Sequence, residues 1–343
     1  MSRTLSVALA GVMLVASGAA HAQTFKMEKW NIGGEGGTDY VTAEQGTNRV
    51  FISRQTHVMV VDGMTGQVLG DIPNTPRMHG IGLAPRHNHG FTTNAGDSSV
   101  TIFDLKTLAF IKKVPIKVGG LDGIMYDAYD DRIILTNHSK PGTAISLDPA
   151  SGDILGTAEL EDNAPEGAMA DGKGHIFVVN ESKNTMQVID VKTMKTTASW
   201  PLAPCDGPTG LAYDAPSNRL FAGCGKTSVV VDATSGKVVA NIANGDGVDA
   251  LGYDASEKLI YIPSGAAGNV TVVRQNSPDK YTVVATVPTV RGAKTIAVDA
   301  ASHRAYLFQP ERGPSTPAPA GSPAGTRPTP GAIIGAWFVA ISH

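Results

Sequence analysis

Short apolar segments alternate with turn residues along most of this sequence. Seven segments share one pattern, in which apolar and β-branched residues lead to a polar residue, and they recur every 40 to 45 residues. They begin at Val50, Phe91, Ile134, Phe177, Phe221, Tyr261 and Tyr306. In five repeats a later segment ends in aspartate, at Asp62, Asp104, Asp148, Asp190 and Asp232, with spacings of 42, 44, 42 and 42 residues. The chain is therefore built from repeats of constant length.

A period in the low forties with strand-like segments is typical of a β-propeller blade, which has four antiparallel strands. Glycine follows the aspartate-ended segment at Gly66, Gly152 and Gly236, where a hairpin turn requires a positive φ. A helical solenoid would need apolar residues at a 3.6-residue period, and that pattern is missing from the sequence. We therefore predict an all-β, seven-bladed propeller with about 43 residues per blade.

The repeats resemble those of the YncE-like, or YVTN-repeat, propeller family. The resemblance rests on strands such as Ile134–Asn137 and Phe177–Asn180, on the aspartate-ended strands with Thr/Ser-Gly turns, and on segments 207–211 and 245–249. The resemblance covers essentially the whole chain after the leader. The repeats lack the Trp-Asp dipeptides of WD40 propellers. The resemblance implies the propeller fold but no particular chemistry, and one branch of the family is linked to DNA binding.

Both ends of the chain are expected in the last blade. Segment 337–341 has the composition of a third strand, and segment 25–32 would supply the fourth, so that the ring closes without an open edge. Segment 309–331 contains seven prolines and is predicted to be an extended surface loop of this blade.

The first residues have the features of a secretory signal peptide. Arg3 precedes an apolar stretch, and Ala20-His21-Ala22 forms a small-x-small cleavage site. We therefore expect a signal peptide over residues 1–22, cleavage after Ala22, and a single periplasmic propeller domain over residues 23–343. The apolar stretch is shorter than the about 20 residues that a membrane-spanning helix needs, so we expect no membrane insertion.

The charge of the chain argues against nucleic acid as a partner. Without the leader 27 basic residues (28 less Arg3) remain against 31 acidic ones, a net charge near −4, and no basic stripe is present. We instead expect a small ligand or a periplasmic protein as partner, and a monomer, because a closed ring leaves few free strand edges.

Two cysteines, Cys205 and Cys224, are expected at the same face of blade 5. An oxidising compartment favours a structural disulfide between them over a redox or metal role.

Candidate binding residues fall on one face of the predicted ring. The connections between blades share this face with the loops between second and third strands. The candidates that these segments supply are Asp39, Arg54, His79, Asp122, Asn137, His138, Glu166, Asn180, Glu181, Asp249 and Lys294. We interpret the histidines of the other face, His87, His89, His175 and His303, as parts of solvated turns.

Two function classes remain open for this face. The first is a ligand-binding or scaffold module that uses the mouth of the central channel. The second is a metal-dependent enzyme of lactonase or lyase type, by analogy of fold. It would hold Ca²⁺ or Mg²⁺ through oxygen ligands from Glu166, Asp249, Asp39 or Asn180, with His79 or His138 as general base.

Two features have structural explanations. The repeated aspartates are expected to bond to neighbouring backbone and to hold each turn. Gly225-Lys226-Thr227 resembles the end of a phosphate-binding loop, but Leu220 stands where that motif requires glycine.

Overall fold

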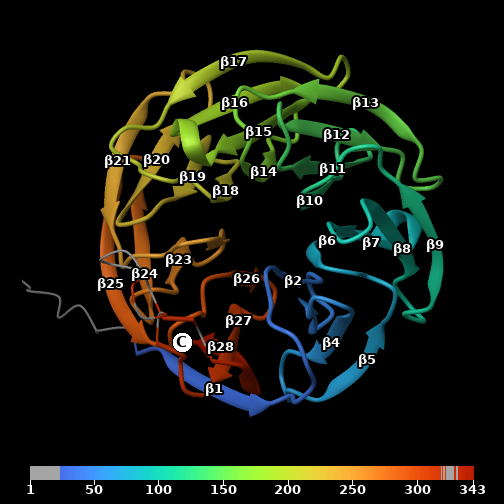
Figure 1. Cartoon of the computed structure of the whole chain (residues 1–343). Coiled ribbons are helices and arrows are strands. Elements are labelled where there is room, and N and C mark those ends of the chain that lie inside the picture. Colours follow the sequence, from blue (N-terminus) through green and yellow to red (C-terminus); the bar gives the residue numbers. More distant parts are fainter. Residues whose placement is uncertain (1–23, 318, 320, 322–327, 330) are drawn as a thin grey trace, which may run out of the picture.

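The structure is a ring of seven four-stranded antiparallel sheets, as the repeats predict (Figure 1). This computed structural model describes residues 24–317, 319, 321, 328–329 and 331–343. The signal peptide expected over residues 1–22 lies outside the described residues. No helix among the described residues is long and apolar enough to cross a membrane.

Blade 1 contains β2 (Val41–Ala43), β3 (Arg49–Ser53), β4 (Val58–Asp62) and β5 (Val68–Ile72), and blade 2 contains β6 (Met78–Ala84), β7 (His89–Asn94), β8 (Ser99–Asp104) and β9 (Phe110–Pro115). Blade 3 contains β10 (Leu121–Asp127), β11 (Arg132–Asn137), β12 (Thr143–Leu147) and β13 (Ile154–Glu159), and blade 4 contains β14 (Pro165–Ala170), β15 (His175–Asn180), β16 (Thr185–Asp190) and β17 (Lys195–Pro201). Blade 5 contains β18 (Gly210–Asp214), β19 (Arg219–Gly223), β20 (Thr227–Asp232) and β21 (Val238–Ala243), and blade 6 contains β22 (Gly252–Asp254), β23 (Leu259–Ser264), β24 (Asn269–Ser277) and β25 (Lys280–Pro288). Blade 7 contains β26 (Ile296–Asp299), β27 (Arg304–Arg312), β28 (Ile333–Ser342) and β1 (Lys26–Asn31), and two short 3₁₀ helices, η1 (Pro85–His87) and η2 (Glu181–Lys183), lie in connections.

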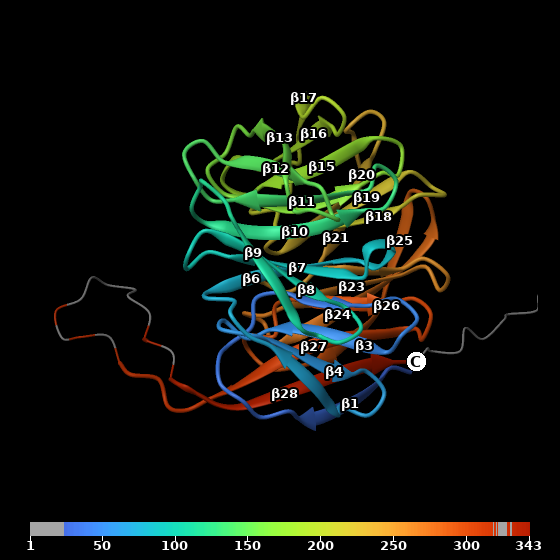
Figure 2. The ribbon, with the colours of Figure 1, turned by 90° about the vertical axis from the view of Figure 1, so that its right-hand side faces the viewer.

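Blade 7 is completed by the first strand of the chain. β1 pairs antiparallel with β28, from Lys26 opposite Ser342 to Asn31 opposite Trp337, and Figure 2 shows the two strands side by side. The predicted closure of the ring is therefore confirmed. β27 continues to Arg312, which pairs with Ile333, so the loop of this blade is shorter than the segment 309–331 expected from its prolines.

The core is divided among the interfaces between blades. The described residues form seven buried apolar clusters, and each cluster joins the middle strands of two neighbouring blades. The middle strands are therefore covered on both faces, as in β4, where Val58 to Val61 are all buried. The outermost strands are largely exposed, as in β5. This explains why the middle strands are apolar without the usual alternation.

The repeated aspartates hold the turns between third and fourth strands, as predicted. Oδ1 of Asp62 accepts hydrogen bonds from the backbone N–H groups of Met64 and Thr65, at 2.9 and 2.8 Å. Asp104, Asp148, Asp190 and Asp232 bond to the backbone of their own turns in the same way. Cys205 and Cys224 form a disulfide within blade 5, with their Cα atoms 5.5 Å apart.

Candidate functional site

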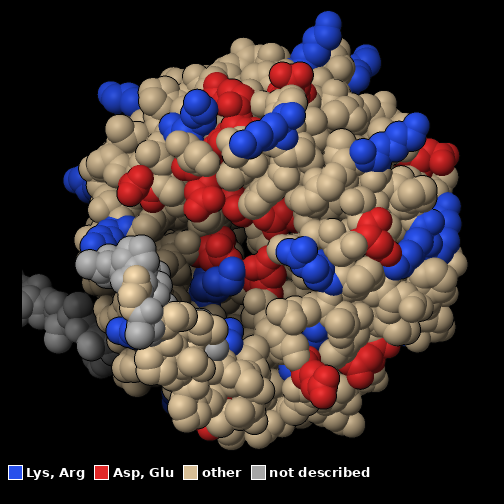
Figure 3. Space-filling model, viewed as in Figure 1, with Lys and Arg blue, Asp and Glu red and all other residues tan. Residues whose placement is uncertain are grey.

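Seven ionisable side chains from six blades meet at one end of the central channel. We call this group the mouth cluster; its members are Asp39, His79, Asp122, His138, Glu166, Asp249 and Lys294. Six of them lie in or beside the connections between blades, and His138 follows the second strand of blade 3. Figure 3 shows carboxylates gathered around the central hollow of this face, with a basic side chain among them.

The backbone of the cluster is held by threonines at the third position of the repeated strand pattern. The hydroxyl of Thr93 in blade 2 donates a hydrogen bond to the carbonyl of Asp122 in blade 3. The hydroxyl of Thr136 in blade 3 donates in the same way to the carbonyl of Glu166 in blade 4, at 3.1 Å. Blades 2 and 3 therefore each position the segment that carries a carboxylate of the next blade.

A glycine brings His138 next to Asp122. The N–H of His138 donates to the carbonyl of Gly120 at 2.7 Å, and Gly120 has a φ of 68°. A Cβ atom at Gly120 would lie 2.3 Å from the carbonyl oxygen of His138. Both the conformation and the close approach therefore require glycine at this position.

Lys294 and Asp39 begin a continuous row of charged contacts. Nζ of Lys294 lies 2.8 Å from Oδ1 of Asp39 and 2.6 Å from Oδ2 of Asp249. The other oxygen of Asp39 forms a short contact with Nδ1 of His79. Lys294 therefore forms ion pairs with carboxylates of blades 1 and 6, and Asp39 also contacts His79 of blade 2.

The row continues through Asp122, which lies between two imidazoles. Oδ1 of Asp122 is 3.5 Å from Nδ1 of His79, and Oδ2 is 2.9 Å from Nε2 of His138. The same Nε2 lies 3.1 Å from Oε1 of Glu166. Tyr40 ends the row, because its hydroxyl donates to Oε2 of Glu166 at 3.4 Å. Carboxylates and imidazoles thus alternate across the mouth.

Hydrogen bonds and charges within this row shift the pKa values of three members against the effect of burial. The hydrogen bonds with Asp122 and Glu166 raise the pKa of His138 to about 10, so this imidazole is charged at neutral pH. Burial opposes ionisation of Asp39, but the hydrogen bond from His79 and the charge of Lys294 lower the pKa of Asp39 to about 2. The hydrogen bond with Asp39 likewise raises the pKa of His79.

Burial has the larger effect on two other carboxylates. It raises the pKa of Glu166, and the charged His138 opposes that rise. It also raises the pKa of Asp249, against the charge of Lys294. The pKa of Tyr40 is raised as well, because its ring is buried and its hydroxyl lies near the charges of Asp122 and Glu166.

Three of the candidates from the sequence have local structural partners instead. Arg54 is fully buried and donates to the carbonyls of the glycine-rich segment, at Gly33, Gly34 and Gly36. The amide of Asn137 bonds to Gly119, Ser139 and Thr143, and that of Asn180 bonds to Thr185 and Gln187. These side chains stabilise strand ends and the start of the first blade.

Glu181 lies in a second feature of the same face, which we call the acidic depression. This hollow has a volume of about 520 Å³ and extends over blades 4 to 6. Its acidic lining residues are Glu181, Asp206, Asp246 and Asp249. Asp249 therefore joins the acidic depression to the mouth cluster.

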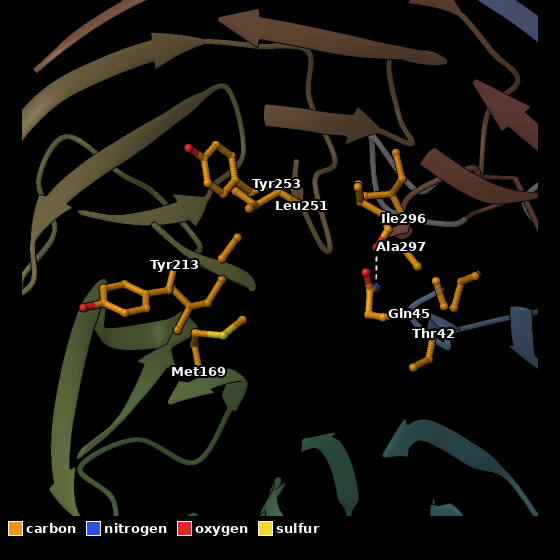
Figure 4. A pocket seen from close by; sticks show the side chains of 14 residues that line it. Thr42, Gln45, Met169, Tyr213, Leu251, Tyr253, Ile296 and Ala297 are labelled. Carbon is orange, nitrogen blue, oxygen red and sulfur yellow. Dashed lines mark hydrogen bonds between the residues drawn. The ribbon is translucent and has the colours of Figure 1, made fainter. Parts of the chain in front are cut away.

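The channel itself is lined mainly by the innermost strands. A cavity of about 330 Å³ has apolar side chains such as Met169, Leu251 and Ile296 along its walls (Figure 4). Gln45 lies in the same wall and donates to the carbonyl of Val298 at 2.7 Å. This part of the channel thus has a mixed lining of apolar and uncharged polar side chains.

The histidines of the other face lie in or beside turns and contact nearby residues: His87 lies in η1 and His303 in a turn, and His89 and His175 begin β7 and β15. His87 contacts Asp131 of blade 3, and His303 lies 2.8 Å from Oδ2 of Asp254 in blade 6. His175 contacts Asp171 within its own blade, and His89 contacts the carbonyl of Pro149.

The possible metal ligands that lie close together include histidine nitrogens as well as carboxylate oxygens. This differs from the set of oxygen ligands expected for Ca²⁺ or Mg²⁺. Among the described residues, two groups have the spacing of metal ligands: Asp39 with His79 and Asp122, and Asp122 with His138 and Glu166. Of the metal ligands expected from the sequence, Asp39 belongs to the first group and Glu166 to the second. Asp249 pairs with Lys294.

Tyr40 is the member of the site that sequence reasoning missed. Tyr40 directly precedes the innermost strand of blade 1, and its hydroxyl contacts Glu166 of blade 4. Its position directly after Asp39, in a connection between blades, is the signal that identifies it.

Comparisons with known proteins find similarity of fold only. No protein-family profile matches the sequence, and no curated protein matches it either. Among solved structures, a chain of hydrazine synthase from Kuenenia stuttgartiensis matches with a TM-score of 0.68 and 16% identity, over 80% of this chain and 92% of that one. The WD40 repeats of RRP9 match with a TM-score of 0.74 and 8% identity, over 92% and 97% of the two chains.

A chain of the mitotic checkpoint complex is similar as well, with a TM-score of 0.71 and 14% identity over 89% of this chain and 95% of that one. At these identities the likeness establishes a propeller fold shared with WD40-type proteins. The fold is consistent with a binding or scaffold module, and a shared fold does not determine the chemistry of the site.

Proposed function

We propose that this chain is an exported, YncE-like propeller that binds a positively charged ligand at its channel mouth. The observation that carries this proposal is that Asp39, Asp122, Glu166 and Asp249, from four different blades, belong to one row of charged contacts at the channel mouth. Repeats that serve only to build a ring do not need different charged residues at one position of each blade.

Charge and shape of the face support a cationic ligand. The acidic depression adds Glu181, Asp206 and Asp246 next to the mouth cluster. Lys294 is the one lysine or arginine with a described ion pair to the cluster, and it already serves two carboxylates. A small organic cation or a basic segment of a periplasmic protein would find complementary charge here.

The proposal is tested with two probes, spermidine and a lysine-rich peptide, by titration calorimetry on metal-free protein. Asp206 and Asp246 are replaced together by asparagine, which removes charge from the acidic depression and leaves the histidines intact. We expect binding of at least one probe to weaken at least about 10-fold and to weaken with added salt.

The matched control replaces Asp153 and Glu257, which belong to turns of the opposite face. This variant should bind the probes as the wild type does. Equal weakening in both variants, or no binding of either probe to the wild type, would refute the proposal. Export is tested separately by fractionation and N-terminal sequencing, with a periplasmic product starting at Gln23 expected.

A second candidate function is a metal-dependent enzyme of lactonase or lyase type. The two histidine–carboxylate groups favour it, because catalytic metal sites commonly combine such ligands and keep a position open for water. Activity on a lactone or lyase substrate that is abolished by chelation and by His138→Gln would support it. Activity that persists after both treatments would exclude the mouth cluster as its centre.

A further inference from the structure

We propose that the mouth cluster binds two divalent transition-metal ions, with Asp122 as the carboxylate that bridges them. This inference rests on the proposed role of the mouth as the functional face and specifies the metal-dependent candidate. One ion takes Nδ1 of His79, Oδ2 of Asp39 and Oδ1 of Asp122. The other takes Nε2 of His138, Oδ2 of Asp122 and Oε1 of Glu166.

The donor atoms already have the spacing that a metal ion requires. Within each group the ligand atoms lie within 4.8 Å of one another. Around His138 the separations from nitrogen to oxygen are 2.9 and 3.1 Å, and the separation from His79 to Asp122 is 3.5 Å. Two donors bound tetrahedrally to one zinc ion at about 2.0–2.2 Å lie about 3.3–3.6 Å apart. The donors around His138 and the closer pair of Asp39 and His79 would therefore have to separate slightly.

Each imidazole presents one nitrogen to two carboxylates. Nδ1 of His79 faces Asp39 and Asp122, and Nε2 of His138 faces Asp122 and Glu166. A single N–H group can point directly at only one acceptor. A cation at the centre of each group would contact all three donors, which makes the convergence of both groups understandable.

Asp122 provides an independent indication of a missing ligand. Asp122 is only 6% exposed, and its Oδ1 has no hydrogen-bond partner among the described residues. This oxygen is directed toward the group formed by His79 and Asp39. Leaving a buried carboxylate oxygen without a hydrogen bond is costly, and a metal ion bonded to it would remove that cost.

The outer carboxylates are oriented by further contacts. Oδ1 of Asp39 is held by Lys294 and Oε2 of Glu166 by the hydroxyl of Tyr40, which leaves one oxygen of each for an ion. Such outer contacts are typical of metal sites, where they fix the direction of the ligands.

The ligand types select the metal. Imidazole nitrogens with carboxylate oxygens suit Zn²⁺ and its neighbours, whereas Ca²⁺ and Mg²⁺ prefer oxygen ligands alone. The side chains of His79 and His138 are 29% and 36% exposed, so the ions would be reachable from the mouth. Three protein ligands per ion leave positions for water or a ligand.

The test measures zinc bound to chelator-treated full-length protein, by equilibrium dialysis against ZnCl₂ with elemental analysis. We expect two zinc ions per wild-type chain and little competition from Mg²⁺ or Ca²⁺. Asp122→Asn should weaken binding of both ions at least about 100-fold, beyond the about 10- to 100-fold that loss of an outer contact causes. His79→Gln and His138→Gln should each lose one ion, which keeps the test valid if Asp122→Asn does not fold.

His303→Gln is the matched control, because His303 contacts a carboxylate on the opposite face at 2.8 Å. It should retain both ions. Manganese added in place of zinc should give a spin-coupled electron paramagnetic resonance spectrum in the wild type and not in Asp122→Asn. A stoichiometry of one or none, uncoupled manganese, or two ions retained by Asp122→Asn would overturn the proposal. If the wild type binds two zinc ions but neither spermidine nor the peptide, only the proposal of a positively charged organic ligand is refuted.

Discussion

The ammonium group of Lys294 lies 2.8 Å from Oδ1 of Asp39, between the last blade of the ring and the first. The same ammonium group contacts Asp249 of blade 6. One side chain therefore connects three consecutive blades at the mouth, where carboxylates would otherwise repel one another.

Replacement of Lys294 by methionine should destabilise the protein. Asp39 and Asp249 would lose their shared counter-charge while remaining partly buried. Because the lysine side chain is 38% exposed, solvent screens part of this effect, and we expect a loss of roughly 1–2 kcal/mol in the free energy of unfolding. Urea unfolding measures it. Lys226→Met, at an exposed pair with a separation of 4.0 Å, should change little, and an equal loss there would contradict the explanation.

The closing strand should depend on one aromatic side chain. Trp30 of β1 stacks on Phe338 with ring centroids 5.8 Å apart, and it also covers Gly66 of blade 1. Trp30→Ala should therefore cost about 2–3 kcal/mol of unfolding free energy, less than for a fully buried tryptophan. Met27→Ala on the same strand, where the residue is 45% exposed, should cost under about 0.5 kcal/mol. Equal effects of the two substitutions would show that Trp30 is not the anchor.

The disulfide should stabilise blade 5 through the chain it closes. Cys205 and Cys224 are 19 residues apart, and a loop of this length corresponds to about 3 kcal/mol in the unfolded-chain account. Unfolding with and without reductant measures this difference. The variant with both cysteines changed to serine should resemble the reduced wild type and should not respond to reductant.

Stability should fall as pH rises through the range where His303 loses its proton. The hydrogen bond to Asp254 raises the pKa of His303 above its usual 6.5, so the charged form is favoured in the folded state. The resulting stabilisation is complete below about pH 6.5 and disappears as pH passes the raised pKa. The difference in unfolding free energy between wild type and His303→Gln should therefore shrink between about pH 6 and pH 9. A constant difference would show that the pair is not linked to protonation.

The repeat was enough to predict the architecture because the same apolar strand pattern occurs in each of the seven blades. The spacing of Asp62, Asp104, Asp148, Asp190 and Asp232 fixed the period, and the turns they hold are those expected. The apolar segments at both ends predicted the pairing of β1 with β28. These features are local or repeated, so they are visible without knowledge of contacts.

The site could be predicted only in part. The rule that connections between blades share one face correctly grouped His79, Asp122 and His138 with the other members of the mouth cluster. The rule could not show which side chains reach the axis. Arg54 has the same position in its blade as His138, directly after the second strand, but its side chain turns toward backbone carbonyls near Gly34. Tyr40 escaped notice because its contact depends on the radius of the ring, which sequence spacing does not give.

The pairing of β1 with β28 joins residues more than three hundred positions apart, from Lys26 to Ser342. During synthesis β1 therefore stays unpaired until β28 has been made. A chain cut short anywhere before β28 would keep two exposed strand edges, which are sites of aggregation and proteolysis. Closure of blade 7 thus requires that β1 and β28 are present in the same chain.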